Sequence, residues 1–135
     1  MRVLVTGGTG YLGQAIVRAL TARGHTAVPF SRATGGDVRD RAALTTAART
    51  VDAIIHSAAL VSIWRRRAAD FDDVNVGGLQ NVLAAAREAR LAKVVYTSSF
   101  LARQPQSANG PLRGNDYQRT KAAALLVADR AAAAG

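Results

Sequence analysis

The chain has 135 residues, 49% of them hydrophobic, so we expect one domain over residues 1–135 with a core of its own. No apolar run approaches the roughly 18 residues that span a bilayer, and the absence of cysteine excludes disulfides and thiolate metal sites. The net charge of +9 comes mainly from arginines scattered along the chain, and with only 5% aromatic residues this pattern argues against nucleic acid as a partner. We expect a small-molecule partner, no metal and no membrane, with the cytoplasm as the default location.

The chain begins with the pattern of a strand, a glycine-rich turn and a helix. An apolar run over residues 1–5 leads into the turn Thr6–Gly13, and a helical pattern continues to about Arg23. In such a turn, one glycine allows the sharp bend, one lets the backbone approach a pyrophosphate and one lets the helix pack on the strand. The helix N-terminus adds free N–H groups and a partial positive charge. The alternative is an ordinary glycine-rich turn, but we expect a dinucleotide to contact Gly7, Thr9, Gly10, Tyr11, Leu12 and Gly13.

The residues after the second expected strand, 26–30, indicate which dinucleotide binds. A carboxylate at this place would accept hydrogen bonds from the adenosine ribose of NAD. The chain instead has Ser31 and Arg32, and a guanidinium pairs well with the 2′-phosphate of NADP. We therefore predict NADP(H) rather than NAD(H), with both residues in the cofactor site. The alternative is that Arg32 is one more surface arginine of an arginine-rich chain.

The next segments continue the alternation of helix and strand. Asp40 is expected to cap a short helix over 41–49, and the unbroken apolar pattern of 51–59 is typical of a buried parallel strand. We expect His56 to be a packed histidine at the end of that strand and not a catalyst. The arginines of segment 64–67 form the one dense positive cluster, beside a tryptophan; they are either solvated or contact an anionic ligand or nucleic acid.

The second half of the chain repeats this pattern and ends in polar groups. A helical pattern covers 71–90, and a further buried strand over 93–100 closes with Ser98 and Ser99. The carboxyl ends of parallel strands are where open α/β sheets bind ligands, so these hydroxyls are candidate site residues. Segment 101–116 is rich in glycine, proline and asparagine, and we expect an active-site loop there.

Asn115 or Asp116 can cap the final expected helix, which carries Tyr117 and Lys121 one turn apart. Residues at i and i+4 share one face of a helix, so the two side chains should lie together. A free phenol is a poor base at neutral pH, and a neighbouring ammonium favours the phenolate that general acid–base catalysis requires. The alternative is a core tyrosine beside a solvated lysine. A hydroxyl at the end of the preceding strand, that of Ser99 or Ser98, would hydrogen-bond the reacting oxygen of the substrate while Tyr117 passes the proton.

Together these motifs resemble the extended short-chain dehydrogenase/reductase superfamily, which includes the NAD-dependent epimerase/dehydratase family. The segments that carry the resemblance are T-G-G-T-G-Y-L-G, D-A-I-I-H-S-A-A, V-N-V-G-G-L-Q-N-V-L, the S-S strand end and Y-Q-R-T-K, and the chain is most similar to dihydroflavonol reductases, 3β-hydroxysteroid dehydrogenases and sugar-nucleotide epimerases. The resemblance implies a Rossmann-like, doubly wound parallel sheet with helices on both faces. It also implies catalytic roles for Ser99 (with Ser98 as the alternate), Tyr117, Lys121 and Asn75, and cofactor contacts at Asp37, Val38, Ser57, Ala58, Ala59, Tyr117 and Lys121.

The chain also departs from this family in two places. Too few residues separate the second strand from Asp37 for a full helix and third strand, so we expect a shortened crossover with at most a vestigial strand. The chain is also expected to end before the sixth strand and the substrate-binding region of its relatives. An NADP(H)-dependent oxidoreductase acting on a carbonyl or secondary alcohol is the first expectation. A sugar-nucleotide epimerase or dehydratase and a non-catalytic nucleotide-binding fragment remain as alternatives, and a homodimer remains open for a full-length protein.

Overall fold

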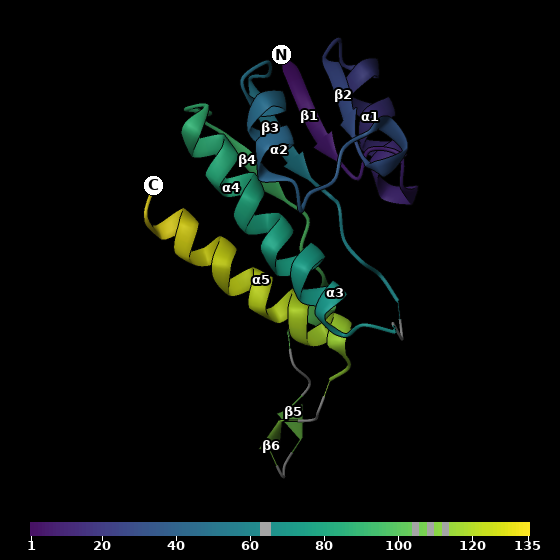
Figure 1. Cartoon of the computed structure of the whole chain (residues 1–135), viewed down its shortest axis with the longest axis vertical. Helices are drawn as coiled ribbons and strands as arrows, with labels where there is room; N and C mark the ends of the chain where they lie inside the picture. Colours follow the sequence, from purple (N-terminus) through teal and green to yellow (C-terminus); the bar gives the residue numbers. More distant parts are fainter. Residues whose placement is uncertain (63–65, 104–105, 108–109, 112–113) are drawn as a thin grey trace.

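The computed structural model describes residues 1–62, 66–103, 106–107, 110–111 and 114–135. The arginine cluster expected beside Trp64 therefore lies partly outside the described residues. Residues 104–105, 108–109 and 112–113 of the expected loop over 101–116 also lie outside them. The described part includes a short 3₁₀ helix, η3 (Phe100–Ala102), and a two-stranded ladder of β5 (Gln106–Ser107) and β6 (Gly110–Pro111) that projects from the body in Figure 1.

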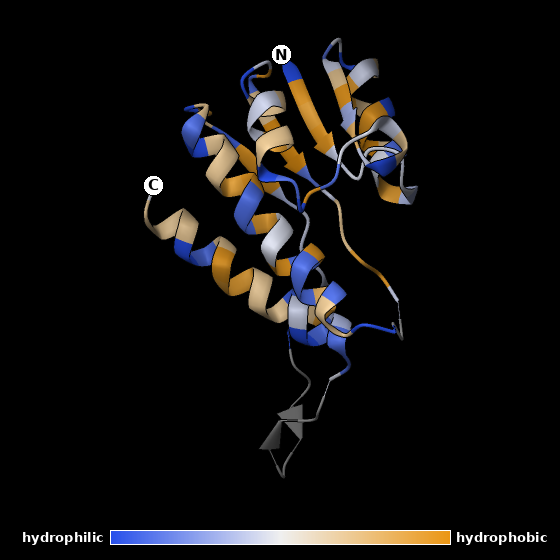
Figure 2. Cartoon of the chain, viewed as in Figure 1, coloured by the Kyte–Doolittle hydropathy of each residue, from blue (hydrophilic) through white to orange (hydrophobic). Residues whose placement is uncertain are grey.

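The centre of the molecule is a parallel sheet of four strands. In chain order these are β1 (Arg2–Thr6), β2 (Thr26–Phe30), β3 (Ala53–His56) and β4 (Val94–Tyr96), and in space they lie in the order β2-β1-β3-β4. Leu4 is in register with Val28 on one side and with Ile54 on the other. Such parallel strands are buried on both faces and therefore apolar, which Figure 2 shows as orange strands inside the fold.

Helices connect the strands and cover the sheet. The helix α1 (Tyr11–Ala22) contacts β1 and β2, whereas α2 (Arg41–Ala48) packs against α4 (Gly78–Glu88), which in turn contacts β3. The C-terminal helix α5 (Asp116–Ala133) lies along α4 (Figure 1). The core between these helices and the sheet is built from fully buried side chains, which include Leu4, Leu44, Ile54, Val82 and Ala85. This arrangement is the Rossmann-like architecture expected from the sequence.

Two helices begin at the residues that the sequence indicates. The side chain of Asp40 accepts a hydrogen bond from the Ala43 N–H at 3.0 Å, so it caps α2. Asn115 accepts from the Gln118 N–H at 2.9 Å, while the Gln118 side chain accepts from the Asn115 N–H at 2.9 Å. This reciprocal capping box fixes the start of α5, and hence the positions of the residues in its first turn.

The crossover after β2 is as short as expected. β2 is followed by one 3₁₀ turn, η1 (Arg32–Thr34), and the chain reaches α2 with no intervening strand in this fully described stretch. β2 is consequently the edge of the sheet. No described helix is both long and apolar enough to cross a membrane.

The helix expected over 71–90 is not uniform. It begins with a single turn, α3 (Ala69–Phe71), continues as a π-helical turn, η2 (Asp72–Gly77), and only then becomes the regular helix α4. A π-turn closes i→i+5 hydrogen bonds and is therefore wider than an α-turn; such turns occur frequently at functional sites. The strand expected over 93–100 is also shorter than the sequence pattern suggests, because regular pairing ends at Tyr96.

Candidate active site

The glycine turn after β1 is shaped by two close backbone approaches. Gly7 has a φ of +71°, and a Cβ built there would lie 2.8 Å from the Cα of Ala58. A Cβ on Gly13 would lie only 2.0 Å from the Gly7 carbonyl oxygen. No side chain caps α1 at Gly10, so the first N–H groups of the helix are open to an anion. The turn is therefore a backbone cradle of the kind that fits a pyrophosphate.

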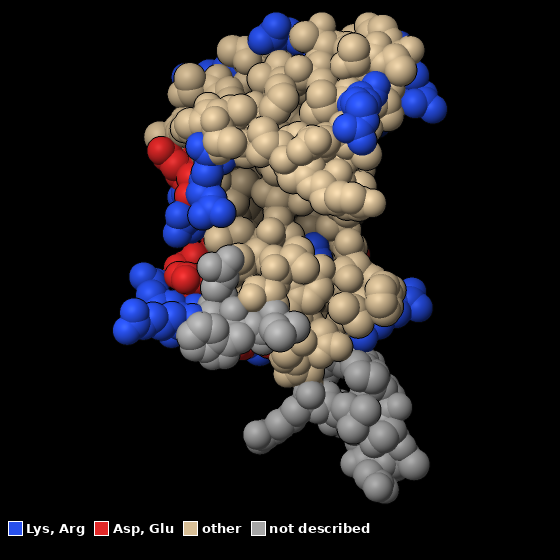
Figure 3. All heavy atoms as spheres, turned by 90° about the vertical axis from the view of Figure 1, so that its right-hand side faces the viewer, with Lys and Arg blue, Asp and Glu red and all other residues tan. Residues whose placement is uncertain are grey.

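This turn forms one wall of a cleft of about 760 Å³, a volume that suits a small-molecule site. Figure 3 shows a hollow between the upper and lower parts of this face. The cleft is lined by the cofactor-contact residues expected from the sequence and by the expected catalytic serine: Gly7, Thr9, Gly10, Tyr11, Leu12, Gly13, Ser31, Arg32, Asp37, Val38, Ser57, Ala58, Ala59, Ser99, Tyr117 and Lys121. The fold therefore brings together residues from four strand ends and from α5.

The end of β2 places hydroxyl and guanidinium groups at the expected adenosine side of the cleft. The Thr9 hydroxyl donates to Ser31 Oγ at 2.9 Å, and Arg32 lies exposed in η1 directly after it. Nearby, Arg39 Nε donates to both carboxylate oxygens of Asp37, at 3.0 and 3.1 Å. This hydrogen bonding by Arg39 lowers the pKa of Asp37. The carboxylate of Asp37 is thus already engaged by an arginine.

The end of β3 is a packed polar layer beneath the cleft. His56 is 1% exposed, and its Nδ1 shares a hydrogen bond of 2.7 Å with the Thr6 hydroxyl. The Ser57 hydroxyl donates to the Thr6 carbonyl oxygen at 2.8 Å. Burial, and secondarily the charge of Lys121, lowers the pKa of His56 to about 3. His56 is therefore a neutral, packed strand-end residue, as the sequence suggested.

The buried His56 should make the protein sensitive to mild acid. Its pKa of about 3 in the folded state lies below the ordinary value of 6.5, so the unfolded state binds the proton more readily. The stabilisation is complete above pH 6.5 and is lost as the pH falls toward 3, by about 2 kcal/mol between pH 6.5 and 4.5. Urea unfolding across this range should show that slope, and His56→Gln should flatten it. A slope that persists in His56→Gln would assign the acid sensitivity to other groups; His25→Gln serves as the matched control.

The first two turns of α5 bring Tyr117 and Lys121 to the cleft. Lys121 is only 4% exposed, and its Nζ donates to the Thr97 carbonyl oxygen at 3.0 Å. Burial lowers the pKa of Lys121 to about 8, so the ammonium still predominates at neutral pH. Across the cleft, Ser99 Oγ accepts from the Leu101 N–H at 3.2 Å, which leaves the hydroxyl hydrogen available to a ligand. A proton donor, a cation and a hydroxyl thus line the same cleft.

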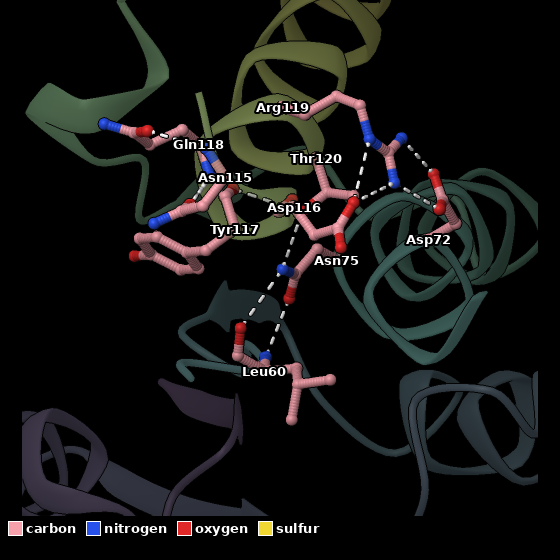
Figure 4. Close-up of polar contacts among 9 residues, drawn as sticks. All are labelled: Leu60, Asp72, Asn75, Asn115, Asp116, Tyr117, Gln118, Arg119 and Thr120. Atoms are coloured by element: carbon pink, nitrogen blue, oxygen red, sulfur yellow. Dashed lines mark hydrogen bonds and ion pairs between the residues drawn. The ribbon is translucent and has the colours of Figure 1, made fainter. Parts of the chain in front are cut away.

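Asn75 does not line the cleft, although the sequence placed it among the catalytic residues. It is 3% exposed on the π-turn, where its Oδ1 accepts from the Leu60 N–H at 2.7 Å and its Nδ2 donates to the Leu60 carbonyl oxygen at 3.2 Å. Nδ2 also donates to Thr120 Oγ1 at 3.0 Å (Figure 4). Asn75 therefore links the loop after β3 to the helix that carries Tyr117 and Lys121.

A second link between the π-turn and α5 is ionic. Arg119 donates to both carboxylate oxygens of Asp72, at 2.8 and 2.7 Å, and also reaches Asp116 (Figure 4). The hydrogen bonds from Arg119 lower the pKa of Asp72. Both side chains are half exposed, so the pair contributes about 0–1 kcal/mol to stability. Its geometric effect is to fix the direction of the α5 N-terminus.

Sequence patterns missed several residues that line or support the cleft. Arg39 was missed because its role depends on folding back onto Asp37, and Thr97 was missed because it acts through its backbone carbonyl. Asp70 and Val74 reach the cleft from α3 and the π-turn. A sequence signal for Asp70 and Val74 was present, because their segment carries the family-like pattern V-N-V-G-G. Apolar periodicity alone does not show which face of that helix borders the cleft.

The parallel sheet, the glycine cradle and the strand-end cleft define a nucleotide-binding α/β domain. Comparison with known proteins gives the family. The profile of the NAD dependent epimerase/dehydratase family matches residues 3–135, and the chain belongs to this family.

Relatives with described activities are enzymes and are longer than this chain. Sterol demethylase protein B of Methylococcus capsulatus is 39% identical over 145 residues, covering 90% of this chain and 44% of the relative. The 2-alkyl-3-oxoalkanoate reductase of Stenotrophomonas maltophilia is 34% identical over 149 residues, covering 96% and 45%. The chain thus spans a little under half the length of these relatives.

Solved structures share the architecture. A UDP-glucose-4-epimerase from Stenotrophomonas maltophila with bound NAD superposes with a TM-score of 0.81 at 28% identity, over all of this chain and 50% of that one. A short-chain dehydrogenase/reductase superfamily protein from Agrobacterium tumefaciens, also with bound NAD, gives 0.78 at 30% identity, over 95% of this chain and 44% of that one.

Proposed function

We propose that this chain forms the cofactor-binding and proton-transfer part of an NADP(H)-dependent oxidoreductase that interconverts a carbonyl and a secondary alcohol. One observation carries the proposal: Ser99, Tyr117 and Lys121 line the same cleft as the glycine cradle. The names of the relatives at 34–39% identity, which include a reductase, support redox chemistry. A 3β-hydroxysteroid dehydrogenase/isomerase of Mycobacterium tuberculosis, 35% identical over 119 residues, supports it further.

In this proposal the chain's own residues handle the substrate oxygen and its proton. Ser99 donates its hydroxyl hydrogen to that oxygen, since its Oγ already accepts from the backbone. Tyr117 gives the proton in reduction and takes it back in oxidation. Lys121, whose ammonium predominates at neutral pH, lines the same cleft as Tyr117 and supplies a positive charge there. When bound, the nicotinamide supplies or accepts the hydride.

The NADP(H) assignment can be tested on this chain by comparing its affinities for NADPH and NADH. The 2′-phosphate distinguishes NADP from NAD, and Arg32 is the exposed guanidinium directly after β2 at the edge of the cleft. Arg32→Ala should weaken NADPH binding about tenfold or more, because a charge-assisted hydrogen bond contributes about 1.5–3 kcal/mol. NADH binding should change less than about twofold on the same reasoning. Isothermal titration of the purified chain with both dinucleotides measures this.

The control for this experiment is Arg18→Ala, which removes an equal charge from an exposed position on α1 outside the cleft lining. It should leave both affinities close to those of the unsubstituted chain. Tighter binding of NADH than of NADPH by the unsubstituted chain would refute the cofactor assignment.

A second candidate is a sugar-nucleotide epimerase or dehydratase, which the solved structural neighbours support because they include a UDP-glucose-4-epimerase and a dTDP-glucose 4,6-dehydratase. Its hydride would return to the substrate, so no net NADPH would be consumed. A full-length version supplied with ketones, aldehydes and nucleotide sugars separates the two: stoichiometric loss of 340 nm absorbance supports the oxidoreductase, and product without such loss supports the epimerase. Cofactor binding with turnover of neither substrate class would leave a non-catalytic nucleotide-binding module.

A further inference from the structure

The ammonium of Lys121 meets two groups from the end of β4. Its Nζ donates to the Thr97 carbonyl oxygen at 3.0 Å, and it lies over the ring of Tyr96, 4.6 Å from the centroid. An ammonium within about 6 Å of an aromatic centroid is attracted by the negative face of the ring. Tyr96 is on β4, one residue before Thr97, so a single strand end supplies both contacts.

The ring of Tyr96 is itself held in place. It stacks on His56 with centroids 5.8 Å apart and an interplanar angle of 22°, and the two residues are partners in the β3–β4 register. His56 is fixed in turn by the hydroxyl of Thr6. Burial raises the pKa of Tyr96 to about 12, so the ring stays neutral at physiological pH. Its attraction for the ammonium is therefore that of an aromatic face and not that of a phenolate.

Lys121 needs such a partner because it is only 4% exposed. A buried ammonium loses its water, and this loss must be offset by contacts within the protein. One carbonyl satisfies one of three N–H donors, and none of the ion pairs among the described residues includes Lys121. Within the described part of the chain, the ring of Tyr96 is a second favourable contact for the charge.

We propose that Tyr96 is a positioning residue, which holds the Lys121 ammonium at the cleft by presenting its ring face from the end of β4. This inference rests on the proposed function for its consequence, which is that Tyr96 supports cofactor binding through Lys121. The ring carries the effect, because the contact with the ammonium is made by the ring face.

A double-mutant cycle on NADPH affinity tests this route. Tyr96→Leu should weaken binding about three- to tenfold, the range expected for a partly buried cation–π contact, whereas Tyr96→Phe should retain the affinity. In a Lys121→Met background, Tyr96→Leu should have little further effect, because the group through which Tyr96 acts is absent. Tyr96→Met, which also lacks a ring, replaces the leucine variant if that one fails to fold. Additive losses, or an equal loss in Tyr96→Phe, would overturn the role.

A cofactor-free measurement keeps this inference separate from the proposed function. The chain has only two lysines, so the buried Lys121 can be compared with the exposed Lys93 by limited acetic anhydride labelling and peptide mass spectrometry. Loss of the ring should raise the labelling of Lys121 relative to Lys93 several-fold in Tyr96→Leu and Tyr96→Met, but not in Tyr96→Phe. Unchanged labelling would refute the positioning role. Failure of the unsubstituted chain to bind either dinucleotide would refute the proposed function, with the labelling result still deciding the role of Tyr96.

Discussion

Replacing Gly13 with alanine is expected to destabilise the protein by about 2–3 kcal/mol and to abolish dinucleotide binding. The added Cβ, whose position is fixed by the backbone, would lie 2.0 Å from the main-chain carbonyl oxygen of Gly7. No side-chain rotation can relieve it, so α1 must move away from β1. The N–H groups at the start of α1 would then no longer point at the site of the phosphates.

Gly10→Ala is the matched comparison, because a Cβ there would lie 3.2 Å from the same oxygen, a contact that small shifts can relieve. Urea unfolding should show a much smaller loss of stability for Gly10→Ala than for Gly13→Ala, while NADPH titration reports what each substitution does to the cradle. Full-strength cofactor binding by a folded Gly13→Ala would show that the close approach of helix and strand is not needed for binding.

Replacing Tyr117 with phenylalanine is expected to reduce turnover about 10²- to 10⁴-fold in a full-length version, the range typical of losing a positioned proton donor. The ring remains at the start of α5, and the capping box that fixes this helix does not involve the phenol. Cofactor affinity should therefore stay nearly unchanged. The loss should appear in kcat more than in KM, since the hydroxyl acts on the reacting oxygen and not on the bulk of the substrate.

Steady-state rates together with NADPH titration separate a loss of proton transfer from a loss of cofactor affinity in Tyr117→Phe. Retained turnover in Tyr117→Phe would remove the phenol from the reaction. Equal losses of turnover and cofactor affinity would instead indicate that Tyr117 helps to hold the dinucleotide.

The sequence predicted those parts of the fold that local chemistry determines. The glycine spacing located the turn, Asp40 located the start of α2, and Asn115, one of two expected caps, is the cap of α5. The short stretch before Asp37 correctly indicated a shortened crossover. Each of these signals lies within a few residues of the feature it specifies. The expected cleft residues also came together, because parallel strands bring their carboxyl ends to one edge.

What the sequence did not predict depends on contacts between distant segments. The amide of Asn75 is satisfied by Leu60 and Thr120, which lie 15 and 45 residues away. The partners of Lys121 are a backbone carbonyl and a ring face, neither of which has a sequence signature. Apolar periodicity likewise does not distinguish an i→i+5 turn from an i→i+4 turn over one winding.

The π-turn matches the helical repeat to the spacing of two buried side chains, Phe71 and Leu79. Phe71 and Leu79 are both buried, at 1% and 0% exposure, and they are eight residues apart with Asn75 midway at 3%. Two windings of an α-helix take about 7.2 residues, so in an ideal helix Phe71, Asn75 and Leu79 would spread over roughly 80° of the helix circumference. The segment therefore contains nearly one residue more than two regular windings need. The wider turn absorbs that surplus, and it lets two apolar anchors and the amide between them face inward together.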